Sequence, residues 1–588
     1  MYIATREETR TFLLNGFILA RWAHELLLTQ RVSHSPESPN RCGILPRRVL
    51  LITFTETSMP TTARHVAQLS QLREDRGQRV VVDGEKIMLI RDGDVVRAYS
   101  ADCPHAGGPL EEGALCRGRI ICPWHKGTFD AATGKVLEPP PLVPLERYAV
   151  IVDGDDVMVT PDKLPDETEP AATQEPRFAV IGAGAAGAAA CAALREYGFT
   201  GRLTLIGDEP HAPYDRTSLS KFVPSAEMPP ADVPPLLAPD WYEQHRVERI
   251  VAKVARLDAR NRTIHLESGG ELTYDTALLA SGSTPKVPRI PGCELGGVHV
   301  LRHLDDATAI VEALRDADAG GPSENAGSVQ VAILGSSFIG LETAAALRKR
   351  GVQVTVISPD KVPFAKQFGE RIGAMFRELH ERNGVKFHLQ AKVASLEGEE
   401  GNVHEVMLES GEHIAADLVL LGTGVTPATG FIDGLPLQKD GGVIVNAGMQ
   451  AAPGLYAAGD IAVFPLRENE EPLRIEHWRV AQQHARIAAQ NMCGARNRYS
   501  GVPFFWTYHF GKNFEYLGHA SEWDELVVDG ELDRQDFAAL YVKDDNVAAV
   551  LACERDTQTA HLIDAMRRGP LTCAQALRIV GRDSCDRS

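Results

Sequence analysis

Several features are scarce in this chain of 588 residues, and each scarcity excludes a class of protein. No apolar run approaches the roughly 20 residues that a membrane-spanning helix needs, so we expect no membrane span. Positive charge is in deficit: 61 Lys and Arg stand against 79 Asp and Glu, which argues against a nucleic-acid partner. The 10 cysteines lack the spacing of a disulfide framework, as expected for a reducing compartment.

The chain is long and rich in apolar residues. Hydrophobic residues make up 44% of the sequence, enough for about four domains with cores of their own. Residues 1–58 match none of the domain patterns, because they combine mixed charges with a polar stretch at 33–41. We interpret them as an unstructured or wrongly assigned extension, with an organelle-targeting segment as the alternative. The expected localisation is cytoplasmic, or mitochondrial under that alternative.

Two Cys-His pairs carry the most specific signal of the sequence. They read Cys103-Pro-His105 and Cys122-Pro-Trp-His125, and glycines follow closely in both loops. Two thiolates and two neutral imidazoles form the ligand set of a Rieske [2Fe-2S] cluster, in which histidines replace two cysteines on one iron. Unrelated Cys-His neighbours and a zinc site are the alternatives that this spacing disfavours. We therefore predict that the four residues bind such a cluster and that the chain transfers electrons.

The residues around these pairs have the pattern of a small β-domain. Apolar runs at 79–82, 86–90 and 95–99 are separated by Asp-Gly pairs, which are strong hairpin signals. We place an all-β domain at residues 63–160. The following stretch, 161–176, is rich in proline and acids and has almost no apolar residue, so we expect an extended linker.

A glycine motif follows the apolar strand predicted at 178–181. Gly182, Gly184 and Gly187 have the GxGxxG spacing and open an alanine-rich helix. Glycines at this spacing allow a tight turn and a close approach of a pyrophosphate to the backbone, with the helix N-terminus favouring the anion. Asp208 follows the next strand, where an acid binds an adenosine ribose. The segment predicts a dinucleotide site.

A second copy of the motif follows the strand predicted at 331–334. Gly335 and Gly340 occupy its outer positions, while Ser337 replaces the middle glycine. Two nucleotides are therefore expected. The usual acid after the second strand is absent, and residues 358–361 read Ser-Pro-Asp-Lys, so the choice between NADH and NADPH stays open. We favour NADH because no arginine stands there.

Three further segments complete a recognisable set. Residues 213–221 read Pro-Tyr-Asp-Arg-Thr-Ser-Leu-Ser-Lys, residues 422–427 read Gly-Thr-Gly-Val-Thr-Pro, and residues 457–460 read Ala-Ala-Gly-Asp. With the glycine motifs, they resemble the apoptosis-inducing-factor-like FAD/NAD(P)-dependent oxidoreductases with an N-terminal Rieske domain, which are related to oxygenase-coupled ferredoxin reductases. The resemblance covers residues 65–570. It implies bound FAD and NAD(P)H as the electron donor.

The resemblance also implies roles for individual residues. It assigns contacts to FAD or to the nicotinamide to Arg216, Lys221, Arg302, Glu342, Gly424, Asp460, Glu476, His477, Trp478 and Trp506, and places Val254 at the adenine end. Glu342, Glu476 and Trp506 would position the nicotinamide against the flavin. No side chain is expected to form a covalent bond.

We predict a multidomain architecture with an all-β Rieske domain, an α/β flavoprotein part with two dinucleotide-binding domains, and a C-terminal α/β domain. The FAD-binding domain is expected in two parts, at 177–300 and 416–495. The NAD(P)-binding domain is placed between them at 301–415. A C-terminal domain of the reductase or dimerisation type follows at 496–588, so the prediction allows a homodimer.

The predicted function is transfer of electrons from NAD(P)H through FAD and the Rieske cluster to an acceptor, as in a ferredoxin-reductase-like component. The acceptor, a protein or a small molecule, is not specified by the sequence. The alternative is a redox-sensing flavoprotein of the apoptosis-inducing-factor type with slow turnover. We found neither the mononuclear iron triad of a Rieske oxygenase nor the cysteine pair of a disulfide reductase.

Overall fold

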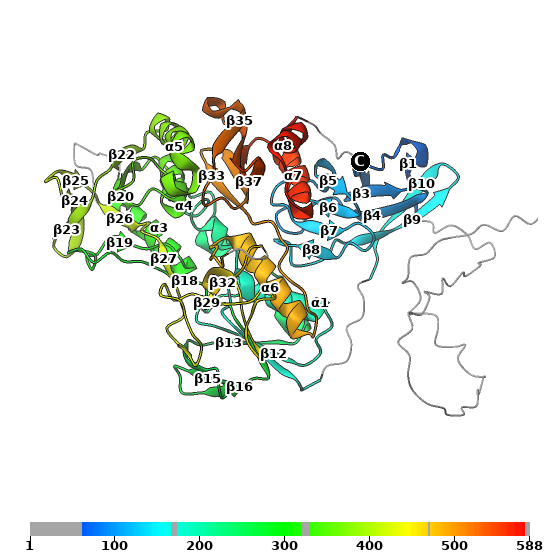
Figure 1. Cartoon of the computed structure of the whole chain (residues 1–588), viewed down its shortest axis with the longest axis horizontal. Coiled ribbons are helices and arrows are strands. Elements are labelled where there is room, and N and C mark those ends of the chain that lie inside the picture. Colours follow the sequence, from blue (N-terminus) through cyan, green and yellow to red (C-terminus); the bar gives the residue numbers. More distant parts are fainter. Residues whose placement is uncertain (1–61, 166–172, 320–328, 468–470, 582–588) are drawn as a thin grey trace, which may run out of the picture. The chain divides into compact units, whose positions relative to one another are not determined.

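A computed structural model describes residues 62–165, 173–319, 329–467 and 471–581 (Figure 1). The expectations for residues 1–58 concern residues outside these ranges. The chain from His65 onward forms one unit. No helix in the described ranges has both the length and the apolar character that a membrane span requires.

The N-terminal domain contains two antiparallel sheets. The larger has the strand order β1 (Arg64–Gln68), β10 (Asp156–Lys163), β9 (Arg147–Asp153), β4 (Val95–Ser100), β3 (Glu85–Asp92) and β2 (Gln78–Val82). The smaller has the order β5 (Ala114–Cys116), β6 (Arg119–Ile121), β7 (Thr128–Asp130) and β8 (Val136–Glu138). The three strands predicted from Asp-Gly spacing are confirmed as β2, β3 and β4. Strand β10 runs to Lys163, three residues into the predicted linker.

The first dinucleotide fold contains a six-stranded sheet built from two separate segments of the chain. Its order is β13 (Val247–Val251), β12 (Arg202–Gly207), β11 (Arg177–Ile181), β17 (Thr276–Leu279), β31 (Leu455–Ala457) and β30 (Gln450–Ala452). The parallel pairing of β17 with β31 closes the sheet across the intervening fold, as a split domain requires. Helices α1 (Ala185–Glu196) and α6 (Trp478–Met492) lie side by side (Figure 1), and their alanines allow close packing.

The second dinucleotide fold has a five-stranded parallel sheet. Its order is β19 (Val298–His299), β26 (Leu418–Leu421), β20 (Gln330–Leu334), β21 (Gln353–Ser358) and β22 (Lys386–Leu389), and its helices are α3 (Leu304–Ala319), α4 (Phe338–Lys349) and α5 (Ala365–Arg382). Strands β19 and β26 lie outside the range 301–415 that the sequence indicated. The sheet takes them in because β26 pairs directly with β20, and β19 pairs with β26.

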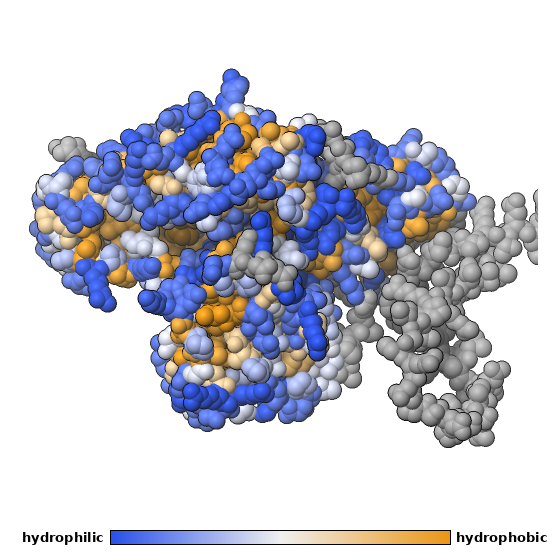
Figure 2. Space-filling view, viewed as in Figure 1, coloured by the Kyte–Doolittle hydropathy of each residue, from blue (hydrophilic) through white to orange (hydrophobic). Residues whose placement is uncertain are grey.

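The C-terminal domain is a five-stranded antiparallel sheet with two helices. Its order is β33 (Phe504–His509), β34 (Lys512–Gly518), β37 (Asn546–Cys553), β36 (Asp536–Lys543) and β35 (Glu525–Glu531), followed by α7 (Asp556–Arg568) and α8 (Cys573–Val580). One apolar core joins this sheet to the second dinucleotide fold, with Phe364, Phe376 and Phe514 in contact. Hydrophilic side chains cover much of the face drawn in Figure 2, and hydrophobic ones show between them in smaller patches.

Shorter elements connect these sheets. They are α2 (Trp241–Gln244), β14 (Val254–Asp258), β15 (Thr263–Leu266), β16 (Glu271–Thr273), β18 (Ser283–Pro285), β23 (Val393–Glu399), β24 (Asn402–Leu408), β25 (His413–Ala415), β27 (Val425–Pro427), β28 (Ile432–Asp433), β29 (Val443–Ile444) and β32 (Ala462–Val463).

Candidate functional site

A cavity of about 430 Å³ is lined by segments of both dinucleotide folds and of β33. Most of the predicted cofactor residues line it, namely Gly182, Gly184, Asp208, Arg216, Lys221, Arg302, Glu342, Gly424, Asp460, Glu476, His477, Trp478 and Trp506. Gly187, Val254, Gly335 and Gly340 do not line this cavity. The motifs therefore come together in one place although they are spread over more than half of the chain.

The first glycine motif forms a cradle at the N-terminus of α1. A Cβ on Gly182, where φ is +114°, would lie 2.1 Å from the carbonyl oxygen of Ala280, and a Cβ on Gly187 would lie 1.9 Å from that of Gly182. Around Gly184, no atom of the described chain lies within 4 Å of an added Cβ. The outer glycines therefore close the turn, while Gly184 presents bare backbone to the cavity, which fits a pyrophosphate.

The second glycine motif is built in the same way. Gly335 has a φ of +117°, and a Cβ there would lie 2.2 Å from the carbonyl oxygen of Gly422. A Cβ on Gly340 would lie 2.4 Å from the carbonyl oxygen of Gly335. These two glycines thus serve the turn itself. Ser337, in the middle position, lines the cavity at the N-cap of α4.

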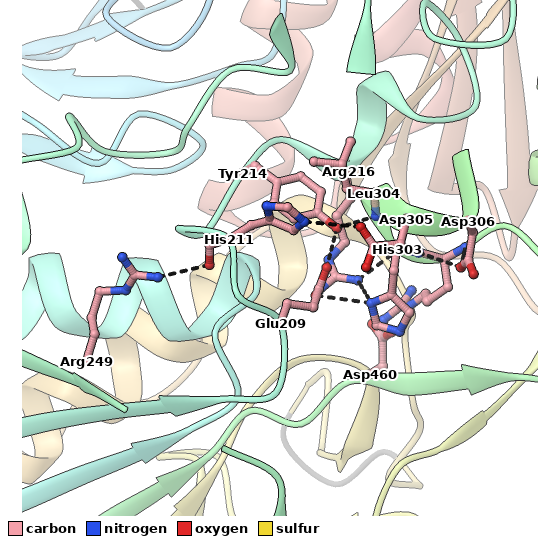
Figure 3. Close-up of polar contacts among 11 residues, drawn as sticks. Glu209, His211, Tyr214, Arg216, Arg249, His303, Leu304, Asp305, Asp306 and Asp460 are labelled. Atoms are coloured by element: carbon pink, nitrogen blue, oxygen red, sulfur yellow. Dashed lines mark hydrogen bonds and ion pairs between the residues drawn. The ribbon is translucent and has the colours of Figure 1, made fainter. Parts of the chain in front are cut away.

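Arg216 is fixed at the cavity wall by Glu209, a residue that the sequence analysis did not single out (Figure 3). Glu209 also accepts a hydrogen bond from the Tyr214 hydroxyl at 2.6 Å and lies 3.0 Å from Nδ1 of His303. Although burial opposes it, hydrogen bonding to His303 and the charge of Arg216 hold the pKa of Glu209 at about 2. The position of Glu209, directly after Asp208, was the signal available in the sequence.

Asp460 follows β31 at the first turn of a short helix and lines the same cavity. Its Oδ2 accepts hydrogen bonds from the Ser283 hydroxyl at 2.6 Å and from Nη2 of Arg302 at 3.1 Å. A carboxylate held in this way fits a role as an acceptor for ligand hydroxyls.

Glu342 is buried where three segments of the chain meet. Its Oε2 accepts hydrogen bonds from Nζ of Lys221 at 2.9 Å and from the Ser220 hydroxyl at 2.6 Å. Its Oε1 accepts one from the Thr507 hydroxyl on β33 at 2.6 Å. The carboxylate is thus almost fully engaged with protein groups and fixes Lys221 at the cavity.

Two side chains of the predicted flavin segment have buried polar atoms that lack a protein partner. Nδ1 of His477 and Nε1 of Trp478 make no hydrogen bond within the described residues, and both residues line the cavity. Burial lowers the pKa of His477 to about 3, so its ring is neutral at physiological pH. Buried polar groups without partners are costly, so their presence fits a bound ligand with polar ring atoms.

The four predicted iron ligands come together in two loops. Cys103 and Cys122 are buried, and the hydrogen bond between their sulfurs raises the pKa of Cys103 and lowers that of Cys122. Nδ1 of His105 lies 3.2 Å from Nδ1 of His125. Burial lowers the pKa of both histidines, which keeps the imidazoles neutral as metal ligands must be.

Each ligand loop is closed by the same backbone contact. The amide of Cys103 donates to the carbonyl of Gly108 at 2.8 Å, and that of Cys122 donates to Gly127 at 2.8 Å. No group of three or more His, Cys, Asp or Glu in the described part of the chain is placed to hold a metal ion. The ligands form one cysteine pair and one histidine pair instead, which fits the two-and-two ligation of a Rieske cluster.

Trp506 connects the two cofactor sites. It lines the cavity, and its ring lies 4.3 Å from that of His125 and 6.2 Å from that of His105, measured between centroids. The side chain belongs to β33, so the C-terminal domain supplies the contact. The family resemblance implied a position for Trp506 at the flavin, but its contact with the histidines was not predicted.

Buried polar contacts attach the cluster domain to the rest of the chain. Lys126, next to His125, is fully buried and donates to Oε1 of Glu515 at 2.7 Å. Arg479 on α6 donates to the carbonyls of Pro139 at 2.7 Å and Lys126 at 3.1 Å. These residues are not among those predicted from the sequence. The available signal was a set of polar side chains at helical spacing on α6, formed by Arg479, Gln483 and Arg486.

Comparisons with known families agree with this geometry. The sequence matches the Rieske [2Fe-2S] domain over residues 62–149, the pyridine nucleotide-disulphide oxidoreductase family over 176–485 and the reductase C-terminal domain over 504–578.

Individual relatives cover between 60% and 86% of the chain. Human apoptosis-inducing factor 3 is 33% identical over 522 residues, which cover 86% of this chain and 84% of that protein. The ferredoxin–NAD(+) reductase component of the biphenyl dioxygenase system of Paraburkholderia xenovorans is 36% identical over 356 residues, covering 60% of this chain and 84% of that protein. The crystal structure of the ferredoxin reductase for the CYP199A2 system from Rhodopseudomonas palustris is 27% identical, with a TM-score of 0.62, and covers 68% of this chain and 96% of that chain.

A protein with these three domains is an NAD(P)H-dependent flavoprotein oxidoreductase that binds FAD and a [2Fe-2S] cluster. The cavity, the two glycine turns and the Cys-His pairs are the features of this chain that fit those groups. The chain belongs to the pyridine nucleotide-disulphide oxidoreductase family, as a member with an N-terminal Rieske domain and a C-terminal reductase domain.

Proposed function

We propose that this chain takes electrons from NAD(P)H and delivers them, through FAD and its own Rieske cluster, to an acceptor. The observation that carries the proposal is the position of Trp506, which lines the flavin cavity and lies 4.3 Å from the ring of His125. The bound cofactors supply the conversion of a two-electron hydride donor into single-electron transfer. The chain would thus combine a ferredoxin-reductase-like component with an attached electron carrier.

The cavity residues bind and orient the cofactors in this proposal. Gly184 and the helix N-terminus of α1 hold the pyrophosphate of FAD, and Asp208 holds its ribose. Asp460, fixed by Ser283 and Arg302, accepts hydrogen bonds from the ribityl chain. An adenine contact of Val254 stays a prediction, since its strand β14 lies outside the cavity.

Charged side chains held in place by the protein line the side of the cavity where the nicotinamide is expected. Glu342 holds Lys221 in place through a buried ion pair, and Glu476 and Trp506 line the same space. At the second nucleotide site Ser358 stands where an acid or arginine would select the cofactor, and its hydroxyl accepts a hydrogen bond from Ser336 at 2.8 Å. No arginine stands in residues 358–361, and Lys361 is paired with Glu370, so NADH is the proposed donor.

Buried contacts support delivery of electrons without a swing of the Rieske domain. The Lys126–Glu515 ion pair is almost fully shielded from solvent, and Arg479 ties the loop that contains Lys126 to α6. Burial raises the pKa of Glu515 to about 8, and the two buried polar groups are costly to separate because each would lose its hydrogen-bond partner away from water. The cluster ligands are therefore held beside Trp506 rather than brought there by motion of the linker.

Steady-state oxidation of NADH and NADPH against a panel of acceptors tests the proposal. With cytochrome c as acceptor, we expect turnover that is lost in His125→Ala, while that variant still reduces a quinone directly from the flavin cavity. The cluster's EPR signal should disappear in the same variant, because an iron ligand is removed. Undiminished cytochrome reduction by His125→Ala contradicts the electron path. Slow turnover with every acceptor supports the signalling alternative instead.

A further inference from the structure

A second cavity, of about 290 Å³, lies away from the cofactor cavity. Its walls come from β6 and β8 of the Rieske domain, from α6 and the segment after it, and from the end of α7. Its charged lining residues are Arg119, Glu138, Arg486, Arg498 and Arg567. Four cations and one anion thus face one small space in a chain whose net charge is −18, so composition does not explain the local excess of positive charge.

Glu138, the one carboxylate of this cavity, already has partners. Its Oε1 is paired with Arg567, and its Oε2 accepts a hydrogen bond from Nε2 of Gln483 at 2.8 Å. Arg479 lies 3.6 Å from the same carboxylate. Although burial opposes it, the charges of Arg567 and Arg479 lower the pKa of Glu138, which keeps it ionised. Glu138 therefore balances only one of the two positive charges of Arg567 and Arg479, and the cavity wall stays positive.

Arg486 is also engaged. The buried guanidinium is paired with Glu196, with Nη1 2.9 Å from Oε2, and Nη2 donates to the carbonyl of Val136 at 2.8 Å. These bonds orient the arginine along the wall between α6 and β8. Arg486, which is buried, and Arg567, which is partly buried, are thus fixed by protein groups, which makes the geometry of the cavity preformed.

Arg119 differs from these arginines. Among the residues that the structure describes, its guanidinium has no hydrogen bond and no ion-pair partner, although the residue is only partly exposed. Burial and the nearby charge of Arg567 lower its pKa, although the more weakly acting charges of Glu138, Asp564 and Asp130 oppose this. A partly buried cation without a partner is costly beside a second cation, and an anion bound between them would remove that cost.

We propose that this cavity is a binding site for a small oxyanion of the phosphate or carboxylate class. Arg119 supplies the free guanidinium, whose planar fork matches two oxygens of such a group, and Arg567 adds charge. The volume of about 290 Å³ suits a small phosphorylated or carboxylated metabolite. The site is separate from the flavin cavity and does not depend on the proposed electron path.

The walls of the site imply a consequence of binding. Because β6, α6 and α7 belong to three different domains, one bound anion bridges all three. A ligand that binds only this assembled form stabilises it by mass action. Binding should therefore raise the thermal midpoint of the full chain and slow hydrogen exchange at β8 and α6.

Isothermal titration of the full chain, loaded with FAD and cluster, tests the site. The probes are inorganic phosphate and succinate in separate titrations, which distinguish the two anion classes. Arg119→Gln should weaken binding of the preferred anion at least about tenfold, as expected for the loss of a charged hydrogen-bonding group. The matched control is Arg117→Gln, the same charge change at an exposed residue on the same hairpin, and it should bind as the wild type does.

Flavin content and the cluster's EPR signal verify that each variant is folded. Should Arg119→Gln fail that check, Arg119→Lys replaces it, and binding should weaken because one ammonium group cannot form the two-pronged contact. Binding of neither anion, or binding that the Arg119 variants leave unchanged, overturns the proposal. The proposal is also overturned if the anion raises the thermal midpoint of the Arg119 variant as much as that of the wild type.

Discussion

Single side chains at the cavity wall are held by partners far away in the sequence. Asp460 has two such partners, Ser283 and Arg302, which lie 177 and 158 residues before it in the sequence. Asp460→Asn keeps the shape of the side chain but removes its charge. We expect FAD to bind about tenfold to hundredfold more weakly, because charge-assisted hydrogen bonds are lost in a partly buried site. The ratio of flavin to protein after dilution and filtration measures the effect.

The matched control for this variant is Asp433→Asn. Asp433 is an exposed acid paired with Arg256, outside the cavity, so the same substitution should leave flavin content unchanged. Full retention of FAD by Asp460→Asn at low protein concentration contradicts the proposed role.

Buried histidines make the stability of the chain depend on pH. Burial lowers the pKa of His484 to about 3, and its Nδ1 accepts from the amide of Gly459 at 3.4 Å. The unfolded chain binds this proton near pH 6.5 and the folded chain does not, so stability falls as pH falls from about 6.5 toward 3. Each such histidine contributes a slope of about 1.4 kcal/mol per pH unit.

His484→Asn keeps a hydrogen-bond acceptor near Gly459 but cannot take up the proton. We expect its thermal midpoint to fall less steeply than that of the wild type between pH 6.5 and pH 5, where the difference amounts to about 2 kcal/mol. Differential scanning calorimetry over this range measures both slopes. Equal slopes show that His484 does not control the acid sensitivity.

Residues within short motifs could be predicted from the sequence, whereas their partners could not. The glycine turns and the Cys-His pairs are local, so spacing alone brings Gly182 near Gly187 and Cys103 near His105. Thr507 gains its role only through a contact with Glu342, 165 residues earlier in the chain, that folding creates. No local pattern encodes such distant contacts.

At the scale of elements, α6 has two buried faces with different partners. Alanines such as Ala481 and Ala485 pack in the core that also contains α1. Arg479, Gln483 and Arg486 lie at helical spacing and contact the Rieske domain. This helix therefore connects the flavin cavity, which begins at its N-terminus, with the domain that holds the cluster.

Arg479→Lys tests this connection. A lysine cannot reach the carbonyls of Pro139, Lys126 and Val502 together, so buried acceptors lose their donor at a cost of about 1–3 kcal/mol. We expect a lower thermal midpoint and slower reduction of the cluster by NADH, with an unchanged Rieske EPR spectrum since the ligands are intact. Calorimetry and rapid mixing measure the two effects.

The control is Arg377→Lys on α5, where the arginine pairs with Glu381 at the surface. That substitution should change neither quantity, because exposed pairs contribute little. If Arg479→Lys behaves like this control, α6 does not hold the Rieske domain in place.

Strands that form hairpins, and strands that precede glycine motifs, could be predicted from the sequence. The boundaries of the second dinucleotide fold could not. β19 and β26 are short, and their apolar residues fit either sheet equally well. Their place is decided by pairing with β20, a contact that the periodicity of the sequence does not specify.

At the scale of the whole molecule, the Rieske domain is attached to the rest of the chain by a shared apolar core and by buried polar contacts. Ala114 and Ile121 of the Rieske domain share a core with residues of the C-terminal domain, and Lys126 pairs with Glu515 inside it. The acidic composition of 161–176 predicted a linker but carried no information on where the domain docks. Docking depends on surfaces that complement each other only in the folded protein.

The most direct test of the proposed electron path is anaerobic rapid mixing of NADH with the full, cofactor-loaded chain. Flavin absorbance and the Rieske EPR signal are followed in the same reaction. The account predicts loss of flavin absorbance first and appearance of the cluster signal second, with Trp506→Leu slowing the second phase. A cluster that stays oxidised while the flavin is fully reduced contradicts the account.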